Sequence, residues 1–167
     1  MGRRCIKLCG ELEKLNKSME KTNVDNLYTR INLEKTNYDI CLPMAILLKP
    51  DSAQIRNIYY SYCKYKKFKS CPIIHDAEIL GKDIEVLGYY DQGYLVAFSL
   101  IRKFDKENIE NFQFAWNYHN PKARFGIRSL QSEIAYYKEN GYKYYYLGLD
   151  APYKRKLQGF EILGPIE

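Results

Sequence analysis

Two arginines at the start of a predicted helix are the first feature of this chain that could do chemistry. Arg124 and Arg128 lie on either side of Gly126, where a run of apolar residues with helical spacing begins. Guanidinium groups bind phosphate through paired hydrogen bonds, and the amides and positive dipole end of a helix N-terminus attract the same charge. The glycine would let a ligand approach the backbone closely. We therefore expect a phosphate-bearing ligand here, although solvated arginines at a helix end would give the same pattern.

A second candidate site is a basic tract that follows an earlier predicted helix. Its lysines are interleaved with the aromatic residues Tyr65 and Phe68. Ammonium groups contact a phosphate backbone and aromatic rings stack on exposed bases, so the tract suits RNA, while a solvated helix end explains the same residues. The lysines expected to bind RNA are Lys64, Lys66, Lys67 and Lys69.

The composition of the 167-residue chain limits the classes of protein to consider. A net charge of +6 favours an anionic partner such as RNA or a phosphorylated cofactor. Five cysteines without a C-x-x-C pair indicate neither a disulfide framework nor a zinc site, so we expect no metal. No apolar run approaches the ~20 residues of a membrane helix, and the polar opening is unlike a secretory signal. We expect a soluble, cytoplasmic protein without a membrane partner.

The N-terminal part of the chain has one clear element. Apolar residues at helical spacing predict an amphipathic helix over residues 8–20. The polar stretch 21–37 is expected to hold a loop, an extended piece or both. We interpret residues 1–37 as a helix and linker of unclear role, and residues 38–167 as one domain. The apolar positions of the helix are Leu8, Leu12, Leu15 and Met19.

A strand and a helix come next. The apolar run 43–49, closed by Pro50, suits a short strand. Asp51 and Gln54 then resemble a capping box, which predicts that a helix begins there. This helix leads into the basic tract, and its predicted buried stripe consists of Ile55, Ile58, Tyr59 and Tyr62.

The second half of the chain predicts four strands and one helix. Segments 84–90 and 94–101 flank a three-residue connection that ends in Gly93, which indicates a hairpin. Residues 111–118 alternate strictly between aromatic and polar or small side chains, as a half-buried strand would, and we assign Phe112, Phe114 and Trp116 to the core. A helix of roughly fourteen residues ends at Gly141, and 144–149 reads as a buried strand.

This order predicts an α+β fold with a mixed sheet and flanking helices. Three strands form an antiparallel meander, and after a helix the last strand pairs beside the third one. The arrangement resembles the GNAT acyltransferases. In that fold the third meander strand and the strand after the helix splay apart, and the acyl donor enters the opening with its anionic part at the helix start.

A closer resemblance rests on four landmarks in order. Residues 117–121 precede the Arg124 loop, Tyr146-Leu147-Gly148 lies in the last strand, and Tyr153-Lys154 leads to the segment 159–163. From about Tyr94 to Leu163 the chain is similar to the catalytic half of arginyl-tRNA-protein transferases. It departs from acetyl-CoA-binding members, because only Gly126 fits their donor loop. It also lacks the closely paired N-terminal cysteines of arginyl-tRNA-protein transferases and has only Cys5 and Cys9 in that part of the chain.

The resemblance implies an aminoacyltransferase that moves an amino acid, arginine in that family, from charged tRNA to an amine, such as a protein N-terminus. The acidic residues that would hold an arginyl side chain have no match here, so the amino acid is open. Aminoacyl-tRNA would be the co-substrate, with no cofactor, and a protein or peptide the acceptor. The implied donor-binding residues are Asn117, Arg124, Phe125, Gly126, Ile127, Arg128, Ser129 and Lys154.

Three residues are candidates for catalysis because aminoacyl transfer needs proton handling and alignment rather than a nucleophile. His119 follows the third meander strand and could act as a base. Tyr153 could orient the donor or donate a proton, and Asp150 could bind the amine. Two other functions remain open from the sequence: an acetyl-CoA-dependent N-acetyltransferase, and a catalytically inactive module that binds RNA or protein.

Overall fold

The structure, a computed structural model, describes residues 27–165. The helix predicted over residues 8–20 and the pair Cys5 and Cys9 lie outside the described residues. The strands are β1 (Leu27–Asn32), β2 (Met44–Ile46), β3 (Ile84–Asp91), β4 (Tyr94–Lys103), β5 (Asn108–Trp116), β6 (Tyr144–Leu149) and β7 (Phe160–Pro165). The helices are α2 (Ser52–Lys66), α3 (Asp76–Leu80) and α4 (Phe125–Glu139), with short 3-10 turns η1 (Leu33–Lys35), η2 (Pro121–Ala123) and η3 (Lys154–Lys156).

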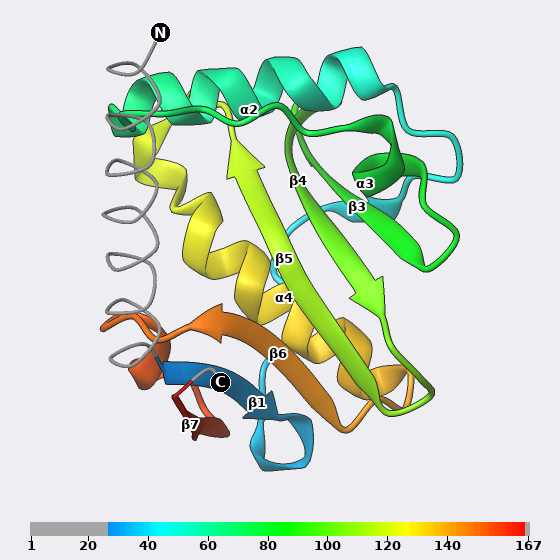
Figure 1. Cartoon of the computed structure of the whole chain (residues 1–167), viewed down its shortest axis with the longest axis vertical. Helices are drawn as coiled ribbons and strands as arrows, with labels where there is room; N and C mark the ends of the chain where they lie inside the picture. The colour runs from blue at the N-terminus through cyan, green and yellow to red at the C-terminus, as the bar shows by residue number, and fades with distance from the viewer. Residues whose placement is uncertain (1–26, 166–167) are drawn as a thin grey trace, which may run out of the picture.

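All seven strands belong to one sheet in the order β2-β3-β4-β5-β6-β1-β7 (Figure 1). Strands β3, β4 and β5 form the predicted antiparallel meander, and β6 pairs parallel to β5 after α4. The predicted fold class is therefore confirmed. None of the helices within residues 27–165 is long and apolar enough to cross a membrane.

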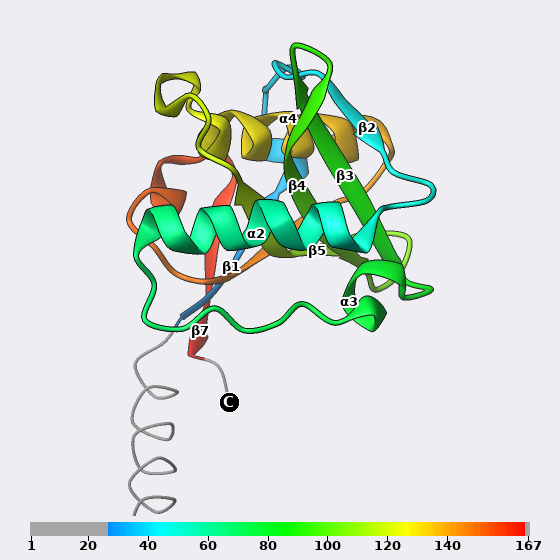
Figure 2. The same ribbon diagram turned by 90° about the horizontal axis from the view of Figure 1, so that it is seen from above.

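The helices cover both faces of the sheet, with α2 on one side and α4 on the other (Figure 2). The predicted cap of α2 is present, because Asp51 Oδ1 accepts hydrogen bonds from the amides of Ala53 and Gln54 at 2.9 and 3.3 Å. Its buried stripe includes Ile55 and Ile58 and packs on β4 and β5. Two apolar clusters result, one on each face of the sheet.

The predicted turn between β3 and β4 is shorter than expected. Asp91 pairs with Tyr94, so only Gln92 and Gly93 form the turn, with φ values of 49° and 83°. Two consecutive residues with positive φ match the twist of the flanking strands better than a longer loop does. The hairpin itself, and the left-handed conformation expected at Gly93, are confirmed.

The half-buried alternation predicted for β5 is wrong in detail. Leu100 pairs with Gln113 but Ile101 pairs with Asn111, so the register shifts at Phe112. A bulge of this kind reverses the face on which the following side chains lie. Phe112 consequently packs with the cluster beneath α2, whereas the later aromatics of β5 pack with the cluster beneath α4. Helices α2 and α4 therefore pack on opposite faces of this strand.

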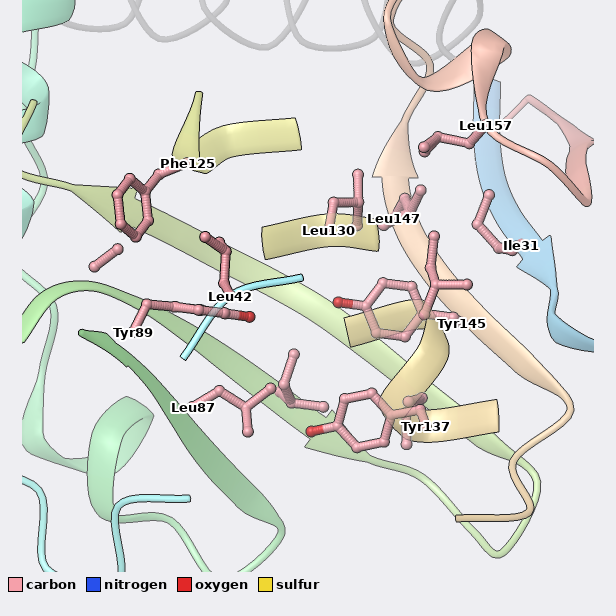
Figure 3. Close-up of a cluster of buried hydrophobic side chains, with 14 of the residues drawn as sticks. Ile31, Leu42, Leu87, Tyr89, Phe125, Leu130, Tyr137, Tyr145, Leu147 and Leu157 are labelled. Atoms are coloured by element: carbon pink, nitrogen blue, oxygen red, sulfur yellow. The ribbon is translucent and has the colours of Figure 1, made fainter. Parts of the chain in front are cut away.

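A single buried carboxylate connects four strands beneath α4. Glu133 accepts hydrogen bonds from the hydroxyls of Tyr89, Ser99 and Tyr145, and from Asn111 Nδ2 at 2.8 Å. These partners come from β3, β4, β6 and β5 in turn, and Figure 3 shows both tyrosines in the core. Burial raises the pKa of Glu133, while the four donors oppose that rise. The network fixes Asn111 at the floor of the opening described below.

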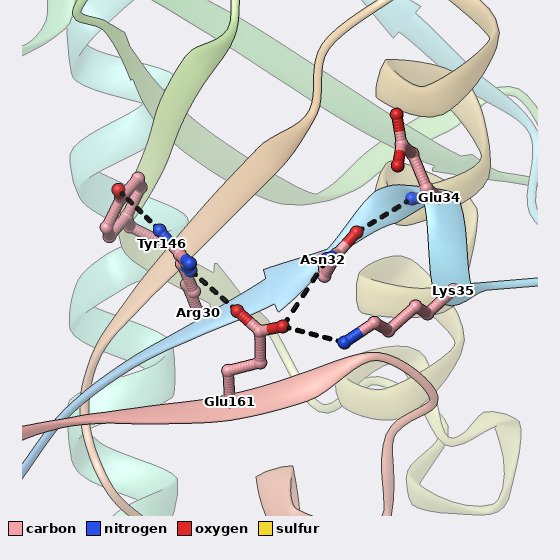
Figure 4. Close-up of polar contacts among 6 residues, drawn as sticks. All are labelled: Arg30, Asn32, Glu34, Lys35, Tyr146 and Glu161. Atoms are coloured by element: carbon pink, nitrogen blue, oxygen red, sulfur yellow. Dashed lines mark hydrogen bonds and ion pairs between the residues drawn. The ribbon is translucent and has the colours of Figure 1, made fainter.

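The extended piece expected within residues 21–37 is strand β1, although its place in the sheet was not predicted, and β7 was not predicted as a strand. Strand β1 lies within the expected linker yet pairs with β6 on one side and β7 on the other. Thr29 and Ile31 are buried, and Arg30 between them faces Glu161 of β7 at 2.8 Å (Figure 4). Lys35 also contacts Glu161, at 3.1 Å. These polar contacts hold the far edge of the sheet beside β6.

Candidate active site

The candidate site begins where β5 and β6 separate. The two strands pair through only three residues each, 108–110 with 144–146. Beyond Tyr146 the strand β6 continues to Leu149 and β5 continues to Trp116, without further pairing between them. The splay implied by the GNAT resemblance is therefore present.

Two adjoining cavities lie at this opening and share Tyr62, Phe114, Gly126 and Tyr153. The larger has a volume of about 480 Å³. Its other lining residues are Tyr38, Lys66, Trp116, Tyr118, Ile127, Gln131, Lys156 and Leu157. The smaller has a volume of about 220 Å³. Its other lining residues are Asn111, Phe112, Gln113, Ser129, Leu130, Leu147 and Lys154.

Aromatic rings form one wall of the larger cavity. Tyr118, with φ of 53°, stacks on Tyr65 at a centroid distance of 3.7 Å and lies against Trp116 at 3.9 Å. Two rings this close to a third must lie on its opposite faces. The stack therefore joins the end of α2 to the end of β5.

The first turn of α4, which holds several of the predicted donor-binding residues, faces both cavities. Gly126 lines both, and a Cβ placed on it would still be 4.0 Å from Phe114, so the glycine adds open space. Ile127 lines the larger cavity and Ser129 the smaller. The first amides of a helix have no partner within the helix, so this turn can donate to an anion.

Two further residues of the loop frame that turn. Arg124 adopts a left-handed conformation immediately before α4, and its side chain is exposed. Phe125 is buried and packs on Trp116 with a centroid distance of 5.5 Å. The loop thus contributes one exposed guanidinium and one anchoring ring.

Arg128 is directed elsewhere. Its guanidinium donates hydrogen bonds to the carbonyl of Cys41 at 2.7 Å and to that of Ala123 at 3.3 Å. It lines neither of the two cavities. The structure gives Arg128 contacts that hold the segment before β2 against α4.

Lys154 occupies the opening itself. Its ammonium donates to the carbonyls of Leu147 and Leu149 at 2.7 and 2.6 Å, on the edge of β6 that β5 has left. Burial lowers the pKa of Lys154, although Asp150 nearby acts against that change. Tyr153 beside it lines both cavities, and burial raises the pKa of its hydroxyl. These two predicted residues are brought together at the site.

The other catalytic candidates lie apart from the two cavities. His119 Nε2 lies 2.5 Å from Asp91 Oδ2 and its Nδ1 lies 2.8 Å from Asn117 Oδ1, in a separate cavity at the β3–β4 turn. Asp150 forms an ion pair with Arg155. The hydrogen bonds that the Arg155 guanidinium donates to this carboxylate lower the pKa of Asp150. Both side chains therefore already have charged or polar partners outside the opening.

The basic tract contributes one residue to the site. Lys66, in the last turn of α2, lines the larger cavity together with Lys156 of η3. Lys67 ends α2 in a left-handed conformation, and the side chains of Lys64 and Lys69 are exposed beyond the cavity. Three of the four lysines therefore form a charged surface beside the site rather than part of its lining.

Several lining residues were missed by sequence reasoning. Tyr38, Lys156 and Leu157 come from segments without a periodic pattern or motif. Gln131 could have been found, because it lies one helical turn after Ile127 and so shares its face. Tyr62 was interpreted as part of a buried stripe, but it points to the cavities from the edge of that stripe.

No protein-family model and no curated protein sequence matches the chain, but solved structures do. It is similar to the C-terminal domain of a putative lysylphosphatidylglycerol synthetase from Agrobacterium fabrum, with a TM-score of 0.56 and 11% identity over 74% of this chain. The structure of L-PGS from Bacillus licheniformis has a TM-score of 0.55 and 15% identity over 74% of this chain. A conserved protein of unknown function from Enterococcus faecalis V583 is described as a probable N-acyltransferase. It has a TM-score of 0.56 and 11% identity over 84% of this chain.

These similarities show the fold. The chain shares its fold with these three solved structures and spans 46%, 45% and 38% of their chains, less than half of each. None of the three is described as an arginyl-tRNA-protein transferase, so that closer resemblance stays a prediction.

Proposed function

We propose that the protein is an aminoacyltransferase that moves an amino acid from charged tRNA onto an amine, with a protein N-terminus as the acceptor. The observation that carries this proposal is the aromatic, lysine-lined cavity at the first turn of α4, which continues into the opening between β5 and β6. A nucleotide-bearing donor and an amine acceptor can meet in such an opening from its two sides.

The larger cavity suits the terminal nucleotide of the donor. Aromatic side chains such as Tyr62 and Trp116 offer surfaces for a base, and Lys66 and Lys156 offer charge for phosphate. Arg124 and the amides of the first turn of α4 add donors at the same place. The exposed lysines beyond Lys66 would contact the RNA backbone outside the cavity.

The smaller cavity suits the reacting ester. In the transfer, the amine nitrogen forms a bond to the ester carbonyl carbon, the ester C–O bond breaks, and the proton lost by the amine goes to the leaving ribose oxygen. Lys154 and Tyr153 place an ammonium and a hydroxyl beside this cavity. Either group can stabilise the oxyanion of the tetrahedral intermediate, and Tyr153 can pass a proton to the leaving oxygen.

The structural neighbours add support of a general kind. The name of the Agrobacterium protein denotes the synthesis of an aminoacyl ester, and the Enterococcus protein is described as a probable N-acyltransferase. Only the second description names acyl transfer, while the first names a product that carries a lysyl group.

A paired transfer assay tests the proposal. The chain is offered a mixed pool of radiolabelled aminoacyl-tRNAs, or radiolabelled acetyl-CoA, with acceptor peptides whose N-termini are free or blocked. We expect label from tRNA on free N-termini, reduced by Arg124→Ala and unchanged by Lys122→Ala, an exposed neighbour. Label from acetyl-CoA alone would make the protein an acetyltransferase, and salt-sensitive tRNA binding without any transfer would make it a binding module.

A further inference from the structure

The charged residues that line the two cavities all have the same sign. Lys66 and Lys156 line the larger cavity and Lys154 the smaller. Within residues 27–165, no aspartate or glutamate lines either one. The remaining walls are mostly aromatic or aliphatic.

Three acidic residues near the segments that form the opening are engaged with other groups. Asp150 pairs with Arg155, and Asp91 contacts His119. Glu133 lies beneath the smaller cavity, but Asn111 donates to its carboxylate and separates it from the space above. None of these carboxylates is placed to receive a cationic group in the cavities.

A buried cation needs a carboxylate or a comparable partner. Placing a guanidinium or ammonium in a cavity without one costs several kcal/mol by rough estimate, and like charges at the wall add to that cost. An aromatic face can hold a cation, but Tyr118 already has Tyr65 and Trp116 against its two faces, and the Lys154 ammonium lies over the ring of Tyr153. A cation at any other ring of the walls would share the cavities with three lysine side chains. The walls favour apolar or aromatic groups instead.

Given the proposed aminoacyl transfer, on which this step rests, we infer that the amino acid carried by the donor has an uncharged apolar or aromatic side chain. Leucine, methionine and phenylalanine fit this description, whereas arginine and lysine do not. The inference departs from the arginine implied by the sequence resemblance. It also departs from the lysyl group in the name of the Agrobacterium neighbour, whose 11% identity carries only the fold.

The test compares donors under one condition. The chain is given single purified tRNAs charged with leucine, methionine, phenylalanine, arginine or lysine, and kcat/KM is measured with one free-N-terminus peptide. We expect at least one of the uncharged donors to react about tenfold or more faster than both cationic ones. Equal or faster transfer of arginine or lysine overturns the inference but leaves aminoacyl transfer intact, whereas no transfer from any donor removes both.

Two substitutions test whether charge is the cause. Gln131→Glu places a carboxylate in the larger cavity and Gln113→Glu places one in the smaller. One of these cavities holds the side chain of the transferred amino acid. For the variant with the new carboxylate in that cavity, we expect the ratio of the arginyl to the leucyl kcat/KM to rise about tenfold. Gln54→Glu, the same change at an exposed position of α2, should leave the ratio unchanged. An unchanged ratio in both cavity variants contradicts the electrostatic argument.

Discussion

The two ends of the β5–β6 pair differ in how their polar groups are satisfied. At the paired end, backbone hydrogen bonds join the strands and Glu133 gathers four donors from four strands beneath them. At the splayed end, the carbonyls of Leu147 and Leu149 receive a lysine side chain in place of a neighbouring strand. A side chain can exchange its partner for a ligand, while a strand cannot without unfolding. Fixed polar contacts and exchangeable ones are thus separated along a single pair of strands.

The largest expected effect is at the paired end. Glu133→Ala leaves the hydroxyls of Tyr89 and Tyr145 buried without their acceptor, and we expect a loss of about 3–5 kcal/mol in the free energy of unfolding. Glu139→Ala, at an exposed position of the same helix, should cost less than about 0.5 kcal/mol. Denaturant titration followed by circular dichroism measures both. Similar losses in the two variants would show that the network does not hold the strands.

The second effect belongs to the splayed end. Lys154→Met keeps most of the apolar stem but removes the ammonium, and we expect kcat/KM for aminoacyl transfer to fall about 100-fold, or ~2.7 kcal/mol, as for loss of an oxyanion donor. Lys122→Met serves as the control. A rate within about twofold of the parent chain would exclude Lys154 from the reaction and weaken the contrast between the two ends.

The third effect tests how far the splayed end reaches toward RNA. Removing one phosphate contact reduces the slope of log K against log salt concentration by about 0.9. We expect this change for tRNA binding by Lys66→Ala, which lines the larger cavity. Lys82→Ala, at an exposed position shortly before β3, should keep the parent slope. Equal slopes for all three proteins would place the RNA elsewhere.

The smallest effect concerns the ion pair between β1, which pairs with the other edge of β6, and β7. The hydrogen bond from Arg30 lowers the pKa of Glu161, so this carboxylate stabilises the fold above its ordinary pKa, and that contribution is lost as pH falls through the lowered folded-state value. Glu161→Gln should cost about 0.5 kcal/mol at neutral pH. The difference from the parent should shrink at about pH 3, as measured by denaturation at both pH values. A constant difference would mean that the charge is not the cause.

Local patterns predicted much of the fold. The cap at Asp51, the hairpin at Gly93 and the helix before Gly141 each depend on neighbouring residues, and all three were found. The place of β1 in the sheet was not predicted because its partners are β6 and β7, far along the chain, and its short pattern competes with a polar context. The bulge at Phe112 also depends on register with β4, which alternation alone does not reveal.

The candidate site was predictable only in part, for a similar reason. Gly126, Lys154 and Lys66 lie in segments with a recognisable pattern, and they do reach the cavities. Arg128 has the same pattern but meets the carbonyl of Cys41, a partner 87 residues away in the sequence. The engagement of His119 by Asp91 likewise needs the β3–β4 turn to bring them together.

The position of β1 has a consequence for how the protein is made. Thr29 of β1 bonds to Gly148 of β6, 119 residues later, and β7 follows later still. During synthesis β1 therefore waits unpaired while the β3–β4–β5 meander and α4 are already complete. Contacts between residues so far apart in the sequence form slowly, and they form after the local contacts. The half of the sheet that contains the opening is thus the last to assemble, so the opening is complete only after β6 has been translated and has paired with β1.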